Sequence, residues 1–336
     1  MVYFMNKDLP KISVIMSVFN GCEFLSEAVE SILSQSFYDY EFIIVNDAST
    51  DNTDQVLFEF QKRDSRIKII TNAYNMGIAK SLNMAISLSR GEFIARMDAD
   101  DYSFPERLKK QYEFMVEHTD IIVCGTSMSI HEEPGNNKTP PLSHEEIISH
   151  IAFDCPFYHS TVMIRKETFL KLGASYPESY KKAQDYGLWV SLFLLTIGEG
   201  YRFINLPDVL LKHRVHPEKE RDDYYNEQLL YSAESQFKLM PYLGVKVNFN
   251  SLVEINFRNK LSGYEIIRLN KILKQIAVGV MLLLAPKDRG YVHDILIAKQ
   301  YKLYSRSKIS NLFGVLLKIY SRLFYFSNRK KIRLFL

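Results

Sequence analysis

The amino-acid sequence predicts an α/β protein with a mostly parallel sheet that is covered by helices on both faces. Short apolar runs rich in β-branched residues alternate with stretches in which apolar residues recur at helical spacing, and this alternation repeats along the first hundred residues. Each of these runs ends in polar side chains. Ligands of open α/β sheets bind at the carboxyl ends of the strands, so these polar groups mark the candidate site.

The first elements follow in a regular order. A strand is predicted over residues 11–18, and a helix starts just beyond Asn20, because Asn20 and Glu23 are spaced like a capping pair. Strands at 42–45, at 67–70 and up to Met97 alternate with helices that end near residues 63 and 89. This repeated order favours parallel pairing of the strands.

After residue 105 the pattern is less regular. A helix is predicted over 106–118, followed by strands at 121–124, up to residue 165 and up to residue 210. Residues 132–143 contain three prolines and a glycine and are predicted to form a mobile surface loop, with a lid over a neighbouring site as the less favoured alternative. A helix starts at Gln184 with Leu188, Trp189, Leu192 and Phe193 facing inward.

Composition places the chain among folded proteins with a large core. Its 336 residues are 47% hydrophobic and are predicted to form two parts, 1–218 and a helical region over 219–336. The longest apolar run, 276–285, is about half of the roughly 20 residues that span a membrane, so a buried helix is expected. Three cysteines without metal-ligand spacing, and no secretory signal, indicate a reducing, cytoplasmic environment.

The net charge of +3 hides an uneven distribution. Residues 295–336 contain ten Lys or Arg and no Asp or Glu, which leaves 32 basic and 39 acidic residues for everything before them. Basic residues interleaved with apolar ones are typical of an element on an anionic membrane surface, and an amphipathic helix packed on the protein fits the same pattern equally well. Nucleic acid is not expected as a partner, because no binding motif accompanies the charge.

An acidic cluster follows the strand that ends at Met97. Asp98 and Asp100 point the same way if the backbone stays extended, and with Asp101 they suit a divalent metal that holds an anionic substrate. An acidic cap for the helix near residue 105 is the alternative. Asp47 ends another strand, where it either accepts hydrogen bonds from a base or ribose or caps the next helix. Neither G-x-G-x-x-G after the first strand nor a P-loop motif is present.

A series of motifs between residues 11 and 216 resembles family 2 glycosyltransferases of the GT-A fold, above all bacterial enzymes that extend capsule, lipopolysaccharide or exopolysaccharide chains. The motifs are ISVIMSVFN at 12–20, SILSQSF at 31–37, VNDASTD at 45–51, NMG at 75–77 with Asn83, MDADD at 97–101, QDYGLW at 184–189 and RVH at 214–216. The sequence departs from the family pattern at Asn46, Ala48, Gln184 and His213, and the last of these is expected to be structural.

The resemblance implies roles for individual residues. Asp47 and Glu23 would lie around the uridine of a UDP-sugar, with the backbone near Phe19 framing the base. The donor site implied by the resemblance comprises Phe19, Asn20, Glu23, Asp47, Asn75, Gly77, Arg96, Asp98 and Ala99. Mn²⁺ or Mg²⁺ would be held by Asp98, Asp100 and His216, and Asp185 would be the catalytic base. His159 either borders the sugar or is structural.

The resemblance therefore implies an inverting, metal-dependent transfer from a UDP-sugar to a hydroxyl of a lipid-linked oligosaccharide, giving a β-linkage, by an enzyme peripheral to the inner face of the cytoplasmic membrane. Two alternatives come from other classes. A sugar-1-phosphate nucleotidyltransferase would need a glycine-rich, basic segment after the first strand, which residues 19–23 are not. A non-catalytic, membrane-associated assembly protein would not need the carboxylates that this chain retains.

Overall fold

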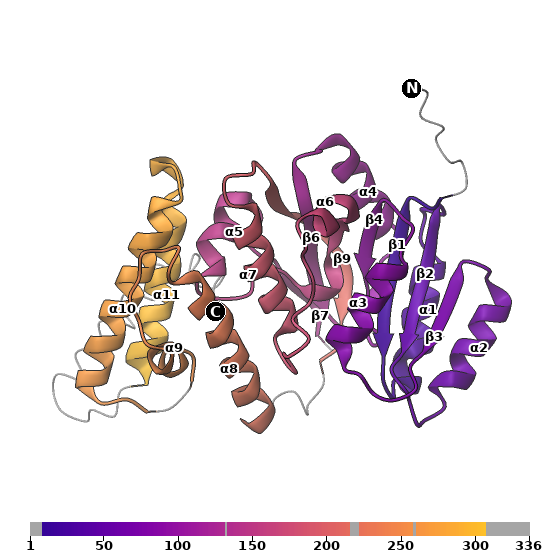
Figure 1. The fold of residues 1–336 in the computed structure, drawn as a ribbon, viewed down its shortest axis with the longest axis horizontal. Helices are drawn as coiled ribbons and strands as arrows, with labels where there is room; N and C mark the ends of the chain where they lie inside the picture. Colours follow the sequence, from indigo (N-terminus) through magenta and orange to yellow (C-terminus); the bar gives the residue numbers. More distant parts are fainter. Residues whose placement is uncertain (1–8, 132, 216–221, 258–259, 307–336) are drawn as a thin grey trace.

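The computed structural model describes residues 9–131, 133–215, 222–257 and 260–306. Figure 1 shows an α/β part that holds the strands and a helical part at the other end of the molecule. The expected α/β class is confirmed. The predicted boundary between the two parts, at residues 218 and 219, lies outside the described residues, and so does the basic tail from residue 307 onward.

The first half of the sheet is parallel, as the alternation of apolar runs predicts. Its strands lie in the order β3-β2-β1-β4, and every neighbouring pair among them is parallel. The strands and the helices that connect them are β1 (Ile12–Val18), α1 (Cys22–Leu33), β2 (Tyr40–Asn46), α2 (Thr53–Arg63), β3 (Ile67–Thr71), α3 (Ile78–Leu88) and β4 (Phe93–Arg96).

The second half makes the sheet mixed. Beside β4 lies β8 (Met163–Arg165), antiparallel both to β4 and to β6 (Ile121–Ile130), while β6 runs parallel to β9 (Arg202–His213). The two-residue strand β5 (Tyr102–Ser103) pairs antiparallel with β9. The remaining elements of the α/β part are α4 (Arg107–Glu117), α5 (His144–Ile151), η1 (His159–Thr161), α6 (Lys166–Lys171) and α7 (Gln184–Thr196).

Two local predictions were wrong. Residues 132–143 were expected to form a loop, but β7 (Glu133–Lys138) pairs antiparallel with β6. Proline and glycine are tolerated there because β7 has β6 as its only partner and so lies at an edge of the described sheet. Asn20 does not cap α1 through its side chain: Gly21 precedes the helix, and Asn20 Oδ1 instead accepts a hydrogen bond of 2.8 Å from the backbone N–H of Thr50.

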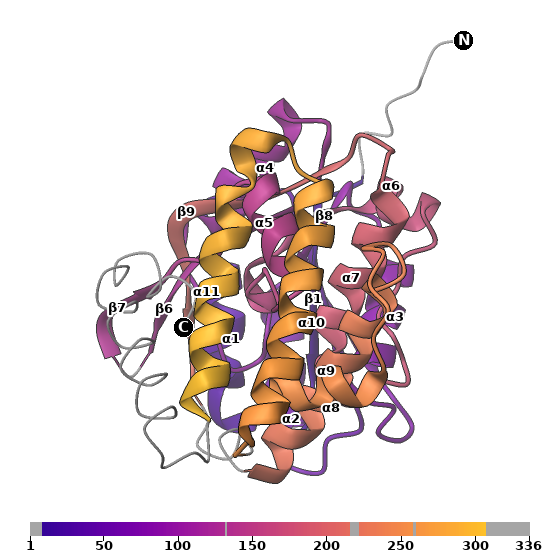
Figure 2. The same ribbon diagram turned by 90° about the vertical axis from the view of Figure 1, so that its left-hand side faces the viewer.

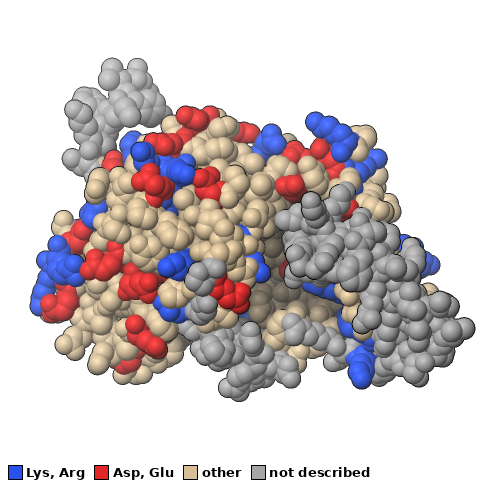
Figure 3. Space-filling view, turned by 180° about the vertical axis from the view of Figure 1, so that it is seen from behind, with Lys and Arg blue, Asp and Glu red and all other residues tan. Residues whose placement is uncertain are grey.

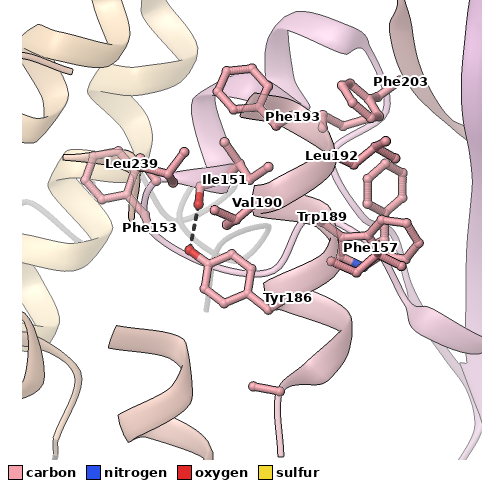
Figure 4. Close-up of a cluster of buried hydrophobic side chains, with 14 of the residues drawn as sticks. Ile151, Phe153, Phe157, Tyr186, Trp189, Val190, Leu192, Phe193, Phe203 and Leu239 are labelled. Carbon is pink, nitrogen blue, oxygen red and sulfur yellow. Dashed lines mark hydrogen bonds between the residues drawn. The ribbon is translucent and has the colours of Figure 1, made fainter. Parts of the chain in front are cut away.

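Two hydrophobic clusters cover the two faces of the sheet. One contains the inward residues of α1, α2 and α4, and the other contains those of α3, α5, α7 and the C-terminal helices. The predicted inward face of α7 is confirmed, since Leu188, Trp189, Leu192 and Phe193 are all buried. Figure 4 shows Trp189 beside Phe157 in the second cluster, where the Tyr186 hydroxyl also donates a 2.6 Å hydrogen bond to Ile151 O.

The C-terminal helices belong to this second cluster. They are α8 (Asp222–Leu239), α9 (Phe249–Asn256), α10 (Gly263–Leu282), η3 (Pro286–Asp288) and α11 (Gly290–Ser305). Figure 2 shows α10 and α11 side by side at this end of the molecule. Buried Ile276, Ala277 and Val280 confirm that the long apolar run is a packed helix. Within the described part of the chain, no helix has the length and apolar character needed to cross a membrane.

Candidate functional site

Two acidic residues that are far apart in the sequence line the same cavity. This cavity, of about 760 Å³, is lined by residues of both motifs, among them Phe19, Arg96, Asp98, Cys155, His159, Ser160 and residues 181–185. Asp98 follows β4, and Asp185 lies in the first turn of α7. The sequence interpretation required these two carboxylates to meet in one pocket, and the fold brings them together.

A buried ion pair fixes Asp98. Arg96 is only 2% exposed and contacts Asp98 Oδ2, while Ser160 Oγ donates a 2.7 Å hydrogen bond to the same oxygen. Burial opposes ionisation of Asp98, but the charge and the hydrogen bond of Arg96 outweigh it and hold its pKa well below the usual range. Asp98 is therefore a carboxylate at neutral pH. Buried Arg107 supports this arrangement, because its Nη2 donates a 2.7 Å hydrogen bond to Arg96 O.

Three carboxylates converge beside this ion pair. Asp98, Asp100 and Asp101 each offer an oxygen within 4.8 Å of the others. Asp101 Oδ1 accepts hydrogen bonds from His213 Nδ1 at 2.9 Å and from the backbone N–H of Arg214 at 3.0 Å. Its Oδ2 is buried without a partner among the described residues. An orphaned carboxylate oxygen next to two further acids fits a hard divalent cation, whose preferred ligands are carboxylate oxygens.

These contacts revise the predicted ligand set in one respect. The acidic run as a whole was expected to suit a metal, but the ligand set implied by the family resemblance leaves out Asp101, which the structure groups with Asp98 and Asp100. His213 bonds to Asp101, in agreement with its expected structural role. His216 lies outside the described residues, so its predicted role as a ligand stays a prediction. Asp98 to Asp101 do not cap α4, which begins at Arg107 after Glu106.

Asp185 has the opposite electrostatic environment. Burial raises its pKa, and this effect exceeds the lowering by backbone N–H groups and by Arg96. Cys155 Sγ lies 3.8 Å from Asp185 Oδ2 and 3.4 Å from Phe157 O. A carboxylate with a raised pKa takes up a proton more readily, so the cavity contains one strongly acidic carboxyl and one more basic one.

The predicted base-binding residues occupy the loops at the ends of β1 and β2. Asp47 is buried, and it accepts hydrogen bonds from Asn72 Nδ2 at 2.7 Å and from the backbone N–H groups of Met76 and Gly77 at 2.8 Å each. It thus holds the turn that leads into α3. Gly77 has φ +86°, and its N–H also contacts Asn75 Oδ1 at 3.1 Å. Asp47 therefore shapes this part of the site through its own contacts, and direct contact with a base stays a prediction.

The other predicted donor-site residues surround the same loops. Phe19 is 49% exposed and lines the cavity, Glu23 is exposed in the first turn of α1, and half-buried Ala99 lies against Gly21. Asn20 and Ala48 both have φ values in the left-handed region, at +51° and +60°. The backbone of Asn20 donates to Ser49 Oγ at 2.9 Å, which ties the two loops together.

Several lining residues were missed by sequence reasoning. Lys181 and Lys182 line the cavity directly before Gln184 and Asp185, and a basic pair next to the motif was the available signal. Cys155 carried no signal, because its contact with Asp185 spans 30 positions. The position of His159 is compatible with both predicted roles, bordering the sugar and a structural one: it lines the cavity, and its Nε2 lies 2.7 Å from the Tyr176 hydroxyl. Burial and then the charge of Arg96 lower the pKa of His159 well below its usual value.

Comparisons with known proteins agree with this geometry. The family model "Glycosyl transferase family 2" matches residues 13–173. EpsE of Bacillus subtilis strain 168, named as a glycosyltransferase, is 38% identical over 228 residues, which are 67% of this chain and 79% of EpsE. The O-antigen biosynthesis glycosyltransferase WbnJ of Escherichia coli is 33% identical over 211 residues, which are 62% of this chain and 81% of WbnJ.

Solved structures show the same fold. S. aureus TarS 1–349 in complex with UDP-GlcNAc has a TM-score of 0.54 at 20% identity, and the match covers 97% of this chain and 89% of that one. The mannosyltransferase PcManGT of Pyrobaculum calidifontis, in complex with GDP-Man and Mn²⁺, has a TM-score of 0.57 at 17% identity, with 89% and 86% covered. These likenesses confirm the GT-A fold with added C-terminal helices.

Proposed function

The chain belongs to glycosyl transferase family 2, and we propose that it transfers a sugar from a UDP-sugar to an acceptor hydroxyl with inversion at the anomeric carbon. One observation carries this proposal. Asp98, kept ionised by Arg96, and Asp185, whose pKa is raised by burial, line one cavity at the carboxyl ends of the strands. An inverting transfer needs a carboxylate base opposite the bound diphosphate, and this arrangement supplies one.

Three groups of residues in the cavity have different proposed roles. Asp98, Asp100 and Asp101 would hold a divalent cation such as Mn²⁺ or Mg²⁺, which neutralises charge on a diphosphate leaving group. Lys181 and Lys182 add positive charge to the same cavity. Asp185 takes the proton of the acceptor hydroxyl as its oxygen attacks the anomeric carbon. Because the attack and the departure of UDP are on opposite faces, an α-linked donor gives a β-linked product.

The proposed donor and the proposed pathway are inferred from relatives and from solved structures of the same fold. The solved complex of TarS with UDP-GlcNAc supports a UDP-sugar as donor, and the complex of PcManGT supports Mn²⁺ as the ion. The relative named for O-antigen biosynthesis supports a role in bacterial polysaccharide synthesis. Within this pathway, the acceptor that we propose is a lipid-linked oligosaccharide at the cytoplasmic face of the membrane, for capsule or lipopolysaccharide.

The outer face of α10 supports a peripheral position on the membrane. Four large apolar residues point outward from it, Tyr264, Ile267, Val278 and Leu282, which are 77%, 63%, 58% and 73% exposed. Exposed Lys271 and Lys274 share this stripe, and no Asp or Glu occupies it. Apolar residues with interleaved lysines match an anionic lipid surface, whereas two copies paired through this face would bring like charges together. Figure 2 shows α10 exposed at the end of the molecule.

A donor assay tests the catalytic proposal. Purified protein with Mn²⁺ is incubated with a panel of UDP-sugars, and release of UDP is measured for the wild type, Asp185→Asn and Asp100→Ala. Release from one sugar by the wild type, lost in both variants, is expected. Pyrophosphate-dependent exchange on the sugar nucleotide would instead indicate a nucleotidyltransferase. Absence of turnover with every sugar, with and without oligosaccharide acceptors, would contradict the proposal.

Sedimentation with vesicles tests the membrane position. The wild type is expected to sediment with vesicles that contain phosphatidylglycerol, and a chain without residues 309–336 and Ile267→Glu are each expected to sediment less. Tyr38→Glu, which changes another exposed residue in the α/β part, is the matched control. Equal sedimentation of all four proteins would rule out a membrane role for the tail and for α10.

A further inference from the structure

Asn83 belongs to the motif series but is not part of the proposed donor or cation site. It lies on α3 and makes two hydrogen bonds to the backbone of one residue. The N–H of Tyr176 donates to Asn83 Oδ1 at 2.9 Å, and Asn83 Nδ2 donates to Tyr176 O at 3.0 Å. The pair needs a side chain that both accepts and donates, as an amide does. Asn83 thus ties the segment between α6 and α7 to α3.

The hydroxyl of Tyr176 extends this connection to a histidine. It lies 2.7 Å from His159 Nε2 and has no other hydrogen-bond partner among the described residues. Tyr176 is 1% exposed, and burial raises its pKa, so the hydroxyl keeps its proton at neutral pH. A buried donor without an acceptor costs stability, and therefore the hydroxyl donates to Nε2.

The ring of His159 has a fixed orientation and one proton. It packs edge-on against Tyr176 and Trp189, with centroid separations of 5.4 and 6.2 Å, and Trp189 itself lies beside Phe157 (Figure 4). Burial and the charge of Arg96 lower the pKa of His159 well below its usual value, so the ring is neutral at pH 7. Because Nε2 accepts a hydrogen bond, the single proton is on Nδ1.

This ring belongs to the wall of the candidate active site. His159 lines the cavity, and its chain neighbour Ser160 donates to Asp98. The charges of Asp98 and Asp185 both act on the pKa of Tyr176, so the two rings lie near both acids. None of the described residues bonds to His159 Nδ1, which leaves this nitrogen for a molecule in the cavity.

We propose that Asn83 and Tyr176 are positioning residues, which hold His159 in the tautomer that presents Nδ1–H to the donor sugar. This inference rests on the proposed glycosyl transfer and adds residues that act on the bound donor through His159. A sugar hydroxyl can donate or accept a hydrogen bond, so a fixed donor in the wall selects one orientation of the sugar.

The imidazole nitrogens report the tautomer without any substrate. In protein labelled with ¹⁵N-histidine, the ring whose NMR signals disappear in His159→Gln is expected to carry its proton on Nδ1 at pH 7. Tyr176→Phe keeps the buried ring of residue 176 but removes its hydroxyl, so the proton is expected to move to Nε2. Asn83→Ala is expected to give a mixture of both tautomers, because Tyr176 is then held less firmly.

Two matched controls make similar changes elsewhere. Tyr40 is also buried, and its hydroxyl donates to Ile32 O at 2.8 Å; Asn270 also makes two side-chain hydrogen bonds, at 2.8 and 2.6 Å. Tyr40→Phe and Asn270→Ala should leave the His159 signals unchanged. A wild-type His159 with its proton on Nε2, or a tautomer that Tyr176→Phe does not alter, would overturn the proposal.

Hydrolysis of the donor shows whether the tautomer matters to the sugar. With Mn²⁺ and a UDP-sugar that the wild type hydrolyses, Tyr176→Phe should lower the rate of UDP release about three- to tenfold, as expected for one hydrogen bond. Affinity for UDP in calorimetry should not change, because UDP lacks the sugar. In the His159→Gln background, Tyr176→Phe should have no further effect, since it acts through His159.

Equal rates in the wild type and in Tyr176→Phe would refute the positioning role, and so would a further loss in the His159→Gln background. If the wild type releases UDP from no sugar, the proposed transfer itself fails. The tautomer of His159 and its dependence on Tyr176 and Asn83 are then decided by the NMR spectra alone.

Discussion

Replacing the proposed base without changing its shape gives the sharpest test of the site. Asp185→Asn keeps the volume of the side chain at the first turn of α7 but removes its ability to accept a proton. A general base contributes about 10²- to 10⁴-fold to a rate, or about 3 to 5 kcal/mol of barrier, so kcat is expected to fall by that factor. The KM for the donor should change little, because the donor diphosphate is proposed to be held by a cation at Asp98, Asp100 and Asp101 and not by Asp185.

The pH dependence provides a second readout of the same group. Burial raises the pKa of Asp185 above its ordinary 3.8, and the base acts only when deprotonated, so kcat falls as the pH drops through this raised pKa. The Cys155 thiol contacts Asp185 Oδ2 and favours its charged form. Cys155→Ala is therefore expected to move the acidic limb to higher pH, while Cys155→Ser, which keeps a donor, moves it less.

Initial rates of UDP release, measured between pH 4 and 8 at saturating donor, decide between the outcomes. Asp39→Asn makes the same chemical change at an exposed position outside the cavity and should leave the rate unaltered. The reasoning is refuted if Asp185→Asn keeps more than a tenth of the wild-type kcat. It is equally refuted if the acidic limb of the pH profile is identical in the wild type and in Cys155→Ala, because the thiol would then have no effect on the pKa of Asp185.

Three further predictions concern other parts of the structure. Asp101→Asn should weaken Mn²⁺ binding by about tenfold in calorimetry, because it removes the charge of the buried, unpartnered Oδ2, and unchanged affinity would remove Asp101 from the ligand set. Ala48→Gly should raise the free energy of unfolding in urea by about 0.5 to 1 kcal/mol. The left-handed φ of +60° costs alanine about 1–2 kcal/mol, and glycine offsets about 0.5–1 kcal/mol of this gain because its unfolded chain has more entropy. A variant less stable than the wild type would contradict this φ value. Trp189→Ala should lower it by about 3–5 kcal/mol because Trp189 is fully buried, whereas Tyr38→Ala, at a residue 72% exposed, should change it by less than about 0.5.

The sequence predicts those features that a local pattern encodes. Periodicity locates β1 to β4 and α1 to α3 within a few residues, and the row of acids after β4 marks a candidate metal site. The pairing of Asp98 with Asp185 could not be derived from local patterns, because they are 87 positions apart and several elements lie between them. The ordered series of family motifs linked the two, and in the structure both line one cavity.

Features that depend on tertiary contacts escaped prediction for identifiable reasons. The strand β7 contains proline and glycine, which signal a loop unless an edge partner is known. Asn20 has the spacing of a capping residue, but its left-handed backbone directs the side chain to Thr50 instead. Another cavity, of about 530 Å³, combines residues from Phe153 to Arg306, and no motif connects them. Figure 3 shows acidic and basic side chains interspersed on the face opposite to Figure 1.

The hydrophobic cluster shared by α5, α7 and the C-terminal helices limits how this enzyme can be dissected. Ile148 and Ile151 on α5 and Leu188 and Val190 on α7 lie in one continuous core with Leu269 and Leu273 on α10. A fragment that stopped before α8 would leave this apolar surface in water and would be expected to aggregate. Experiments that transfer donor specificity between relatives should therefore replace loops at the strand ends and keep the α/β part and the C-terminal helices from the same protein.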